Sequence, residues 1–439
     1  MFTHHRGDGV ESDRSPPRPE RCCRGVSPRF PIVTTRATGG VERPKARLRG
    51  QIVSTGPMEL ETTRMVAGGD ALARAADGRV ALVDGALPGE RVRVAITSDR
   101  PDHLRAQVVE VLEAAPERIE PPCVHARHGC GGCGWQHVTV DAQRTYKRDI
   151  ISDALRRIAH VEDPPLRDTI ELPPTGYRST VRALVVDGRA AFRRHRAHDP
   201  VPVDSCLVAH PLVEDMLRHG FFRGAEEVTL RAGIGTGERC AYSDPKDAPI
   251  ELAADVRTGP RAHMHEVVDG MHFRISARSF FQTRTDGAEA LAHLVRDAVG
   301  TDRVVADLYC GVGLFAGLVD SPRQLFAVER DRHAFADARH NLRGRPARVV
   351  RGDVGAWRGE AVDVVIADPS RAGLGRAGAR TVFRCAPARV VLVSCDAAAF
   401  ARDVALLRDG GYDLTAITPV DLFPHTPHVE CVSILDREP

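Results

Sequence analysis

The chain lacks long apolar runs and a strong charge of either sign. No stretch of its 439 residues approaches the roughly 20 apolar residues of a membrane-spanning helix, and its N-terminus lacks the apolar segment of a signal peptide. These absences predict a soluble, cytoplasmic protein with no membrane partner. The formal net charge of +2 permits a nucleic-acid partner but does not require one.

Cysteine is plentiful, and eleven cysteines in such a chain favour metal-binding or catalytic roles over a disulfide framework. Three of them, Cys123, Cys130 and Cys133, stand in the segment "PPCVHARHGCGGCGWQH", where glycines permit tight turns. Three clustered thiolates need a fourth ligand to complete a metal centre. Cys206 and Cys240 are the candidates further along the chain.

The spacing of these cysteines indicates the kind of metal centre. Zinc sites usually take their ligands in closely spaced pairs. Three clustered cysteines with one distant partner are closer to the ligand pattern of a [4Fe–4S] cluster. Zinc, held with the help of His125 or His128, is the alternative. Since no redox partner is evident, a cluster here is interpreted as structural or positioning.

The N-terminal third divides into a tail and a β-rich region. Residues 1–46 are rich in Arg, Pro, Ser and Gly without a hydrophobic period, which predicts a disordered tail. Residues 47–114 contain short alternating segments with glycine turns, such as "GRVALVDGALPGERVRVAI", and these predict a small OB-like β-barrel. Recurrent arginines suit a nucleic-acid accessory domain, and a barrel used only for packing is the alternative.

The rest of the chain is predicted to form two further domains. Residues 115–275 mix a helix at Thr145–Ala159 with a hairpin around Asp187-Gly188, which predicts an α+β central domain. Residues 276–439 alternate apolar strands with helices. This pattern predicts an α/β, Rossmann-like domain whose parallel sheet is covered on both faces. Ligands of such sheets bind beyond the carboxyl ends of the strands.

A glycine loop follows the first strand of this domain, in "VVADLYCGVGLFAGL". Its Gly311 and Gly313 match the G-x-G-x-x-A pattern of dinucleotide-binding folds, so an iron–sulfur oxidoreductase has to be considered. However, Asp307 ends the strand just before the loop, where a pyrophosphate would require only N–H dipoles. A carboxylate suits a cofactor with an ammonium group, such as S-adenosylmethionine.

The next three strands also end in acids. Glu329 can accept hydrogen bonds from two ribose hydroxyls, and Asp353 can accept one from an adenine amine. Asp368 ends the fourth strand, in "VIADPSRAG". The series favours a cationic methyl donor over a nicotinamide dinucleotide.

Cys395 ends the fifth strand, in "RVVLVSCDAAAF", and Glu430 enters a late β segment from the same side. A thiolate and a carboxylate beside a methyl donor suit methylation of an unactivated carbon such as uracil C5. The thiolate would add to C6 and the carboxylate would remove the C5 proton. A packing role for Cys395 and a metal site at His425-x-x-His428-x-Glu430 are the alternatives.

The motifs "SFFQT", "DLYCGVGLF", "VER", "DPSRAGLG", "VSCD" and "DLFPHTPHVE" together resemble those of the RNA 5-methyluridine methyltransferase family, from about residue 47 to the C-terminus. The resemblance implies that Cys395 is the nucleophile and Glu430 the proton acceptor. It also implies a TRAM-type barrel and methyl-donor contacts, with Asp368 close to the target base. The methyl-donor residues matching the family motifs are Gln282, Tyr309, Glu329, Asp353 and Asp368.

Family members with this cysteine spacing carry a [4Fe–4S] cluster, and Cys206 is the fourth ligand that matches them. The resemblance implies an RNA partner, with rRNA favoured over tRNA, and no obligate protein partner. The basic segment Arg193-Arg194-His195-Arg196 is a candidate phosphate contact.

The chain departs from the family pattern at Arg284, Leu314, Ser370 and Asp396-Ala397. An extra carboxylate at Asp396 is expected to disfavour the Cys395 thiolate. Two further alternatives follow. One is an RNA-binding iron–sulfur protein whose catalytic site has decayed. The other is an RNA cytosine-C5 methyltransferase, although those enzymes carry Pro-Cys where this chain has Pro369-Ser370.

Overall fold

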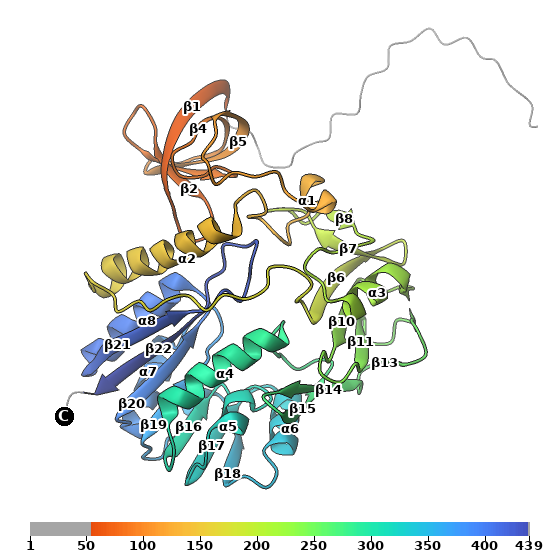
Figure 1. Cartoon of the computed structure of the whole chain (residues 1–439), viewed down its shortest axis with the longest axis vertical. Helices are drawn as coiled ribbons and strands as arrows, with labels where there is room; N and C mark the ends of the chain where they lie inside the picture. Colours follow the sequence, from red (N-terminus) through yellow and green to blue (C-terminus); the bar gives the residue numbers. More distant parts are fainter. Residues whose placement is uncertain (1–53, 438–439) are drawn as a thin grey trace, which may run out of the picture. The chain divides into compact units, whose positions relative to one another are not determined.

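The computed structural model describes residues 54–437 (Figure 1). The predicted disordered tail, residues 1–46, lies outside these residues. No helix of the described part of the chain has both the length and the apolar character needed to cross a membrane.

The N-terminal strands form a closed barrel in the order β1-β2-β3-β5-β4, which confirms the predicted OB-like barrel. Every other residue of β4 is buried along most of its length, as expected when one strand face packs inside a barrel. Below the barrel, the fully buried Glu90 accepts hydrogen bonds from Arg118, which ties the barrel to the following segment. The barrel strands are β1 Ser54–Met65, β2 Ala71–Arg74, β3 Val80–Asp84, β4 Arg91–Asp99 and β5 His103–Glu113.

The central region contains a sheet of order β13-β11-β10-β6-β7-β8. The predicted hairpin is confirmed: β6 and β7 pair around Asp187 and Gly188, which have φ angles of 50° and 75°. The strands of this region are β6 Thr180–Val186, β7 Arg189–Arg193, β8 Pro200–Pro202, β9 Phe221–Phe222, β10 Glu227–Ala232, β11 Arg239–Asp244, β12 Ile250–Glu251, β13 Val256–Thr258, β14 His263–Val268 and β15 Met271–Ser276.

The predicted helix at Thr145–Ala159 begins earlier than its apolar spacing indicated. Helix α2 spans Val140–Ala154 and continues as a π-helix, η1, over Leu155–Ala159. Its first turn holds the buried Gln143, whose amide bonds to loop backbone, so that a polar residue occupies an inward position. The other helices of this region are α1 Val124–Arg127 and α3 Pro211–His219.

The C-terminal sheet has the order β18-β17-β16-β19-β20-β22-β21. Its first five strands are parallel, as predicted, and β22 is antiparallel to both β20 and β21. The strands are β16 Val304–Leu308, β17 Gln324–Glu329, β18 Ala347–Arg351, β19 Val364–Ala367, β20 Arg389–Ser394, β21 Tyr412–Pro419 and β22 Cys431–Arg437. The helices are α4 Thr285–Val299, α5 Leu314–Leu318, α6 Arg332–Asn341, the 3₁₀ turn η2 Val354–Ala356, α7 Gly375–Cys385 and α8 Ala397–Asp409.

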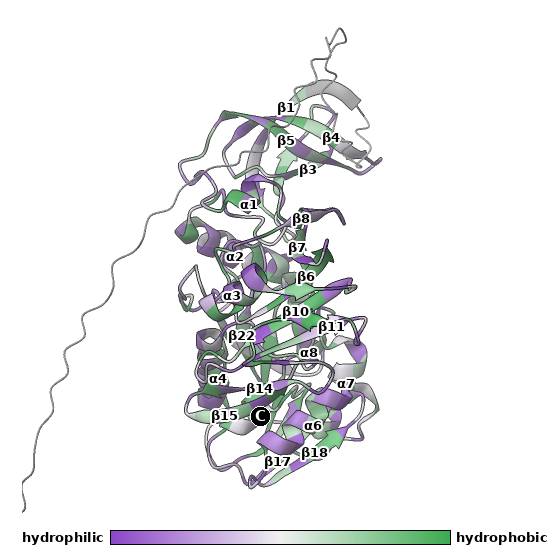
Figure 2. Cartoon of the chain, turned by 90° about the vertical axis from the view of Figure 1, so that its right-hand side faces the viewer, coloured by the Kyte–Doolittle hydropathy of each residue, from purple (hydrophilic) through white to green (hydrophobic). Residues whose placement is uncertain are grey.

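Helices cover both faces of this sheet. Alternate residues of β20 enter two separate cores: Val391 and Val393 pack with α4 and α5, whereas Val390 and Leu392 pack with α7 and α8. This alternation is the period of a strand buried on both faces. Figure 2 shows the contrast, with hydrophobic strands inside and hydrophilic residues over α6 and α7. The architecture is a Rossmann-like α/β domain with an N-terminal barrel and a mixed central region, as predicted.

Candidate active site

A cavity of about 640 Å³ opens at the carboxyl ends of the parallel strands. This is the edge at which ligands of such sheets bind. Most of the predicted catalytic and methyl-donor residues line it together, although only Glu329 lies inside a strand and the others lie in loops that follow β15, β16, β19 and β20 or precede β22. They are Gln282, Tyr309, Gly311, Glu329, Asp368, Cys395 and Glu430.

Cys395 and Glu430 are placed opposite each other by the pairing of β20 with β22. The last pair of this antiparallel ladder is Ser394 with Cys431. Cys395 continues β20 by one residue and Glu430 precedes β22 by one, so they occupy the next opposing position. Residues directly opposite in an antiparallel pair have Cα atoms about 4.5–5.5 Å apart. The predicted nucleophile and base are therefore neighbours across the sheet, although 34 positions separate them in the sequence.

The electrostatic surroundings of Cys395 favour the protonated thiol. Burial raises the pKa of Cys395 to about 12, and the neighbouring carboxyls of Glu430 and Asp368 act in the same direction. Arg371, which also lines the cavity, opposes them, and Asp396 has the smallest effect of these groups. The thiol consequently has to lose its proton before it can act as a nucleophile.

Asp396 has a structural role that the sequence pattern did not reveal. Its Oδ1 accepts a hydrogen bond of 2.8 Å from the backbone N–H of Ala399, and it forms the N-cap of α8. A carboxylate at this position stabilises the first turn of a helix. The expected unfavourable effect of Asp396 on the Cys395 thiolate is present, but burial and the two cavity acids exceed it.

Two acids of the cavity, Asp368 and Glu430, are also biased toward their neutral forms. Burial raises the pKa of Asp368 to about 7 and raises that of Glu430 well above its ordinary value, and Asp368 adds to the shift of Glu430. A carboxyl group whose pKa lies near the working pH can both accept and release a proton efficiently. Nearby, burial lowers the pKa of His428 to about 4, so this ring is neutral and its Nε2 faces Arg371 at 3.3 Å.

Asp307 lies beneath the glycine loop and is fully buried. Its Oδ2 accepts a hydrogen bond of 3.1 Å from the N–H of Ala316, while its Oδ1 has no hydrogen-bond partner in the described part of the chain. Burial raises the pKa of Asp307 to about 8. A buried carboxyl oxygen without a partner is costly unless a ligand satisfies it. The unpaired Oδ1 of Asp307 could accept a hydrogen bond from a cationic or other hydrogen-bond-donating ligand.

The glycine loop itself requires left-handed backbone. Gly313 has φ 89° at the N-cap of α5, and a Cβ there would lie 3.2 Å from Leu342. Tyr309 adopts φ 70°, which is unusual for a residue with a bulky side chain and is a form of strain found at functional sites. Glu329 holds this loop from the neighbouring strand, because its Oε2 accepts a hydrogen bond of 3.0 Å from the N–H of Gly311.

Three of the predicted methyl-donor residues do not line the cavity. Asp307 and Gly313 are buried behind it, as described above. Asp353 is a largely exposed side chain that caps η2, where its Oδ1 accepts a hydrogen bond of 2.9 Å from Gly355 N–H. Burial raises the pKa of the nearby Tyr309, and the charge of Asp353 adds to this rise, but the structure does not place Asp353 in the cavity wall.

The departures from the family pattern fall into two groups. Leu314 and Ser370 line the cavity. Arg284 instead is fully buried outside it, where its guanidinium lies over the Tyr177 ring at 4.3 Å and pairs with Asp286 at 2.7 Å. Arg284 thus stabilises the start of α4 and does not line the cavity.

Several cavity residues were not predicted from the sequence. They include Phe280, whose side chain is 64% exposed at the cavity, as well as Arg178, Arg371 and His428. His428 was considered only as part of a metal motif with His425 and Glu430, and His425 does not line the cavity. Within the described residues no three His, Cys, Asp or Glu side chains are grouped closely enough to hold a metal ion, so this motif does not form a metal site.

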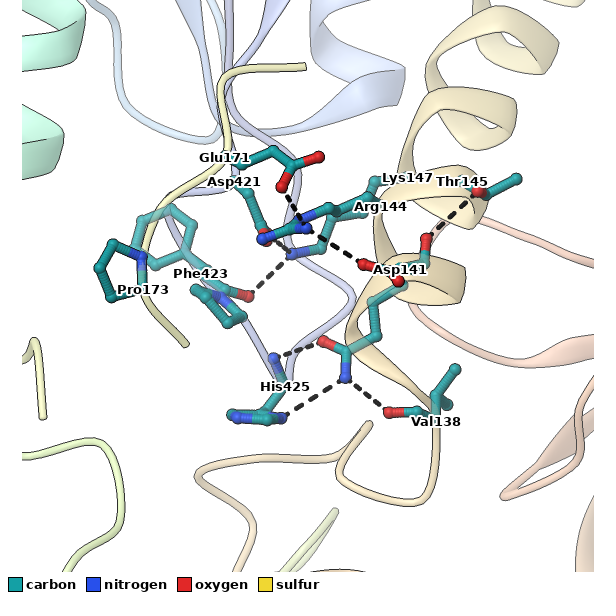
Figure 3. A network of polar contacts seen from close by, with 12 residues as sticks. Val138, Asp141, Arg144, Thr145, Lys147, Glu171, Pro173, Asp421, Phe423 and His425 are labelled. Atoms are coloured by element: carbon teal, nitrogen blue, oxygen red, sulfur yellow. Dashed lines mark hydrogen bonds and ion pairs between the residues drawn. The ribbon is translucent and has the colours of Figure 1, made fainter. Parts of the chain in front are cut away.

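A buried polar network fixes the loop that leads to Glu430 (Figure 3). Lys147 of α2 donates to Asp421 Oδ1 at 2.8 Å and to the carbonyl of Phe423 at 2.9 Å. Gln143, one turn earlier, accepts a hydrogen bond of 2.6 Å from the N–H of His425. His425 has φ 64°, so the network also holds a strained residue in place. Helix α2 thereby positions the loop carrying the predicted base.

A second cavity, of about 250 Å³, is lined by Cys123, Cys130, Cys133 and Cys206. Burial raises the pKa of the Cys130, Cys133 and Cys206 thiols, and neighbouring thiols of the group add to each shift. The other candidate ligand, Cys240, is instead packed in the hydrophobic core around α4.

Within residues 54–437 no three His, Cys, Asp or Glu side chains, the four cysteines included, are grouped as ligands of a metal ion. His125 also lines this cavity, with its Nε2 3.0 Å from Asp204, whereas His128 does not. Two residues, Gly132 and Arg178, line both this cavity and the one that holds Cys395.

The described fold and cavity define a Rossmann-like methyltransferase architecture with an appended barrel. Residues 62–109 match the TRAM domain. The chain is 34% identical over 423 residues to an uncharacterized RNA methyltransferase of Streptomyces avermitilis, covering 86% of this chain and 98% of that protein. It is 32% identical over 457 residues to one of Gloeobacter violaceus, covering 90% and 98%.

Among solved structures, the tRNA (uracil-54, C5)-methyltransferase of Pyrococcus abyssi in complex with S-adenosyl-L-homocysteine is similar. The TM-score is 0.64 at 22% identity, over 86% of this chain and 100% of that one. At this identity the likeness shows a shared fold. The extended similarity to the relatives above establishes that this chain belongs to the RNA methyltransferase family.

Proposed function

We propose that this protein transfers a methyl group from S-adenosylmethionine to C5 of a uridine in RNA through a covalent adduct between Cys395 and uracil C6. The observation that carries the proposal is the placement of Cys395 and Glu430 at opposing positions of one antiparallel ladder, in the lining of a cavity that also holds strand-end acids. The P. abyssi enzyme of similar fold, which acts on uracil C5 of a tRNA, supports the same chemistry.

Methylation at this carbon requires a nucleophile and a base in turn. The Cys395 thiolate forms a bond to C6, and the electron pair of the C5–C6 double bond moves to O4. Bound S-adenosylmethionine supplies an electrophilic methyl group to C5 and leaves as S-adenosylhomocysteine. The Glu430 carboxylate then removes the C5 proton, the double bond re-forms, and the Cys395 thiolate is expelled.

The cavity residues suit these steps. Glu430 is buried and has a raised pKa, so its carboxylate is a stronger base than an exposed glutamate. Asp368 has a pKa of about 7 and can donate a hydrogen bond to a uracil carbonyl when it is protonated. Phe280, exposed at the cavity, offers a flat surface for stacking a base, as single-stranded RNA recognition commonly requires.

The described residues also fit S-adenosylmethionine. Asp307, fully buried just before the glycine loop, has an Oδ1 with no hydrogen-bond partner among the described residues, and the carboxylate of Glu329 lines the cavity and accepts a hydrogen bond from Gly311 N–H. Together with Gln282 and Tyr309 they would hold the ammonium, ribose and adenine parts of the methyl donor.

We also propose that Cys123, Cys130, Cys133 and Cys206 hold a [4Fe–4S] cluster. All four cysteines line one cavity, and three clustered cysteines with one distant partner are closer to the ligand pattern of an iron–sulfur cluster than to that of a zinc site. The shared residues Gly132 and Arg178 suggest a positioning role toward the RNA site. We propose rRNA as the substrate, with tRNA as the alternative.

The test is incubation with 5-fluorouridine-substituted RNA and S-adenosylmethionine, because fluorine at C5 cannot leave as a proton and traps the adduct. We expect a covalent complex that is absent in Cys395→Ala. Comparing rRNA and tRNA fractions from a strain lacking the gene identifies the substrate. No adduct with either RNA would contradict the proposal and favour a catalytically decayed RNA-binding protein. An adduct formed with 5-azacytidine-substituted RNA alone would favour the cytosine-C5 reaction.

A further inference from the structure

A strongly basic depression of about 480 Å³ adjoins the catalytic cavity. We call it the arginine depression. Asp331 lines both the depression and the cavity, so the two are continuous at this residue. The residues that line the arginine depression are Arg278, Arg330, Asp331, Arg332, His333 and Arg351.

The arginines come from separate elements that meet at the same sheet edge as Cys395. Arg351 ends β18 and is paired in register with Glu329, the last residue of β17. Arg330 follows β17 directly, and Arg332 opens α6. Arg278 lies two residues after β15 and two before the exposed Phe280. The depression therefore extends outward from the cavity mouth on the ligand-binding side of the sheet.

The positive charge of this group is only weakly neutralised by the protein. Among the described residues, the one ion pair made by the four arginines joins Arg330 to Asp353 at 3.9 Å, between side chains that are 82% and 61% exposed. Such an exposed pair contributes little binding energy. Asp331 forms no ion pair with these arginines among the described residues, and its Oδ1 accepts hydrogen bonds from the backbone N–H groups of His333 and Ala334.

Two of the other three arginines, Arg278 and Arg332, make side-chain contacts that involve no acid. The Arg278 guanidinium lies over the Tyr242 ring at 4.7 Å, an arrangement that orders the side chain and leaves its N–H groups for another acceptor. Arg332 contacts only the His333 ring, at 3.1 Å, among its polar neighbours in the described chain. Four arginines with unused donors in one open depression form a site for several phosphate groups, since guanidinium binds phosphate through paired hydrogen bonds.

We propose that the arginine depression binds the phosphate backbone of the RNA that flanks the target nucleotide. This inference rests on the proposed function, because it takes the cavity to hold a base of that RNA. A base inserted beside Cys395 leaves its neighbouring phosphates at the cavity mouth, next to Phe280 and Asp331. The depression is open and its arginines are exposed, which suits a polyanion running along the surface better than a small enclosed anion.

The test measures the salt dependence of RNA binding. The probe is a fluorescein-labelled RNA hairpin of mixed sequence, and binding is followed by fluorescence anisotropy over a range of KCl concentrations. The variant is Arg330→Gln/Arg332→Gln. The matched control is Arg303→Gln/Arg343→Gln, which also removes two exposed arginines. Arg303 directly precedes β16 and Arg343 follows α6, so both lie toward the amino ends of the parallel strands, away from the depression.

Each phosphate contact contributes about 0.7–0.9 to the slope of log Kobs against log salt concentration. We expect the depression variant to lose about 1 to 2 from this slope, with RNA affinity about tenfold weaker at low salt. The control variant should keep the wild-type slope. Titration with S-adenosylhomocysteine and the melting temperature serve to show that both variants are folded.

The outcomes separate this inference from the proposed function. If the wild type methylates RNA, the depression variant should raise KM for RNA while kcat stays near the wild-type value. If the depression variant has a reduced slope but the wild type transfers no methyl group, the result would support phosphate binding in the depression and contradict the proposed function. An unchanged slope, or a loss of S-adenosylhomocysteine affinity without a loss of RNA affinity, would overturn the inference.

Discussion

The catalytic cavity and the cysteine cavity share Gly132 and Arg178 but are built in different ways. The catalytic cavity collects residues from the ends of successive parallel strands, whose order and direction the fold dictates. The cysteine cavity joins one glycine-rich loop to Cys206, a segment more than 70 positions away. Regular strands make the first cavity predictable from strand-end residues, whereas the second depends on how loops fold back on each other.

The largest expected effect is a loss of turnover when the proposed base, Glu430, is replaced while the proposed nucleophile, Cys395, is kept. Glu430→Gln keeps the shape of the side chain but cannot accept the C5 proton, so turnover should fall by about 10²- to 10⁴-fold. Because Cys395 is intact, the methylated RNA should remain attached, and a covalent complex should appear on denaturing gels with ordinary uridine RNA. A variant that released its product normally would show that another group is the base.

A second prediction concerns the buried carboxyl below the glycine loop. Asp307→Asn should weaken S-adenosylhomocysteine binding by about 100-fold, since charged hydrogen bonds in buried sites contribute up to roughly 3 kcal/mol. Calorimetric titration measures this loss. Asp353→Asn, at a residue outside the cavity wall, is the matched comparison and should cost much less.

The same substitution should stabilise the free protein. The pKa of Asp307 is raised to about 8, so the native state resists ionisation that the unfolded chain undergoes near pH 4. The carboxyl is thus stabilising below pH 4, and this contribution is lost as the pH rises to about 8. Asp307→Asn should therefore gain roughly 2–4 kcal/mol at pH 7 and clearly less at pH 5 in chemical unfolding.

A third prediction uses pH to rank the groups around the thiol. The pKa of Cys395 is raised to about 12, so the rate of adduct formation with 5-fluorouridine RNA should rise up to about tenfold per pH unit between about pH 6 and pH 8. Glu430→Gln removes an acid that raises this pKa when it is ionised, so the profile should shift to lower pH over the range in which Glu430 carries its charge. Asp396→Asn should shift it less, because Asp396 has the weaker effect. Equal shifts would contradict the ranking of these acids.

A fourth prediction tests the cysteine cavity. If the proposed cluster is present, anaerobically purified protein is brown, and Cys206→Ser should abolish this colour and lower the melting temperature because the cluster would lose a ligand. Cys240→Ala is the matched control: it creates a small core cavity but should leave the visible absorbance unchanged. A colourless wild-type protein containing stoichiometric zinc would overturn the cluster assignment.

The smallest expected effect lies at the wall between the cavities. Arg178 has a buried Nε without a hydrogen-bond partner in the described chain, and its charge lowers the pKa of Cys130, Cys133 and Cys206. Arg178→Gln should raise KM for RNA about 3- to 10-fold and leave the cluster absorbance in place. Loss of the absorbance instead would assign Arg178 to the cysteine cavity alone.

The parallel strands, the barrel and the hairpin at Asp187-Gly188 were predictable because each depends on local periodicity and turn chemistry. The start of α2 was not, because Gln143 turns inward to bond with backbone far along the chain. Asp353 carried the same strand-end signal as Glu329 but points to its own 3₁₀ turn. Phe280 and Arg371 stand inside the motifs "SFFQT" and "DPSRAGLG", and Arg178 stands outside every quoted motif. Nothing local indicated that these three side chains line the cavity, since exposure and proximity are properties of the folded chain.

The sequence by itself determined the order of strands and helices along the chain, the acids at the strand ends and the four cysteines that we propose as cluster ligands. Periodic burial and residue chemistry specify these features locally. Only the tertiary structure decided that Glu430 stands opposite Cys395, that Asp396 caps a helix, and that four arginines meet beside the cavity. Those facts depend on strand register and on contacts between distant segments, which no single stretch of sequence contains.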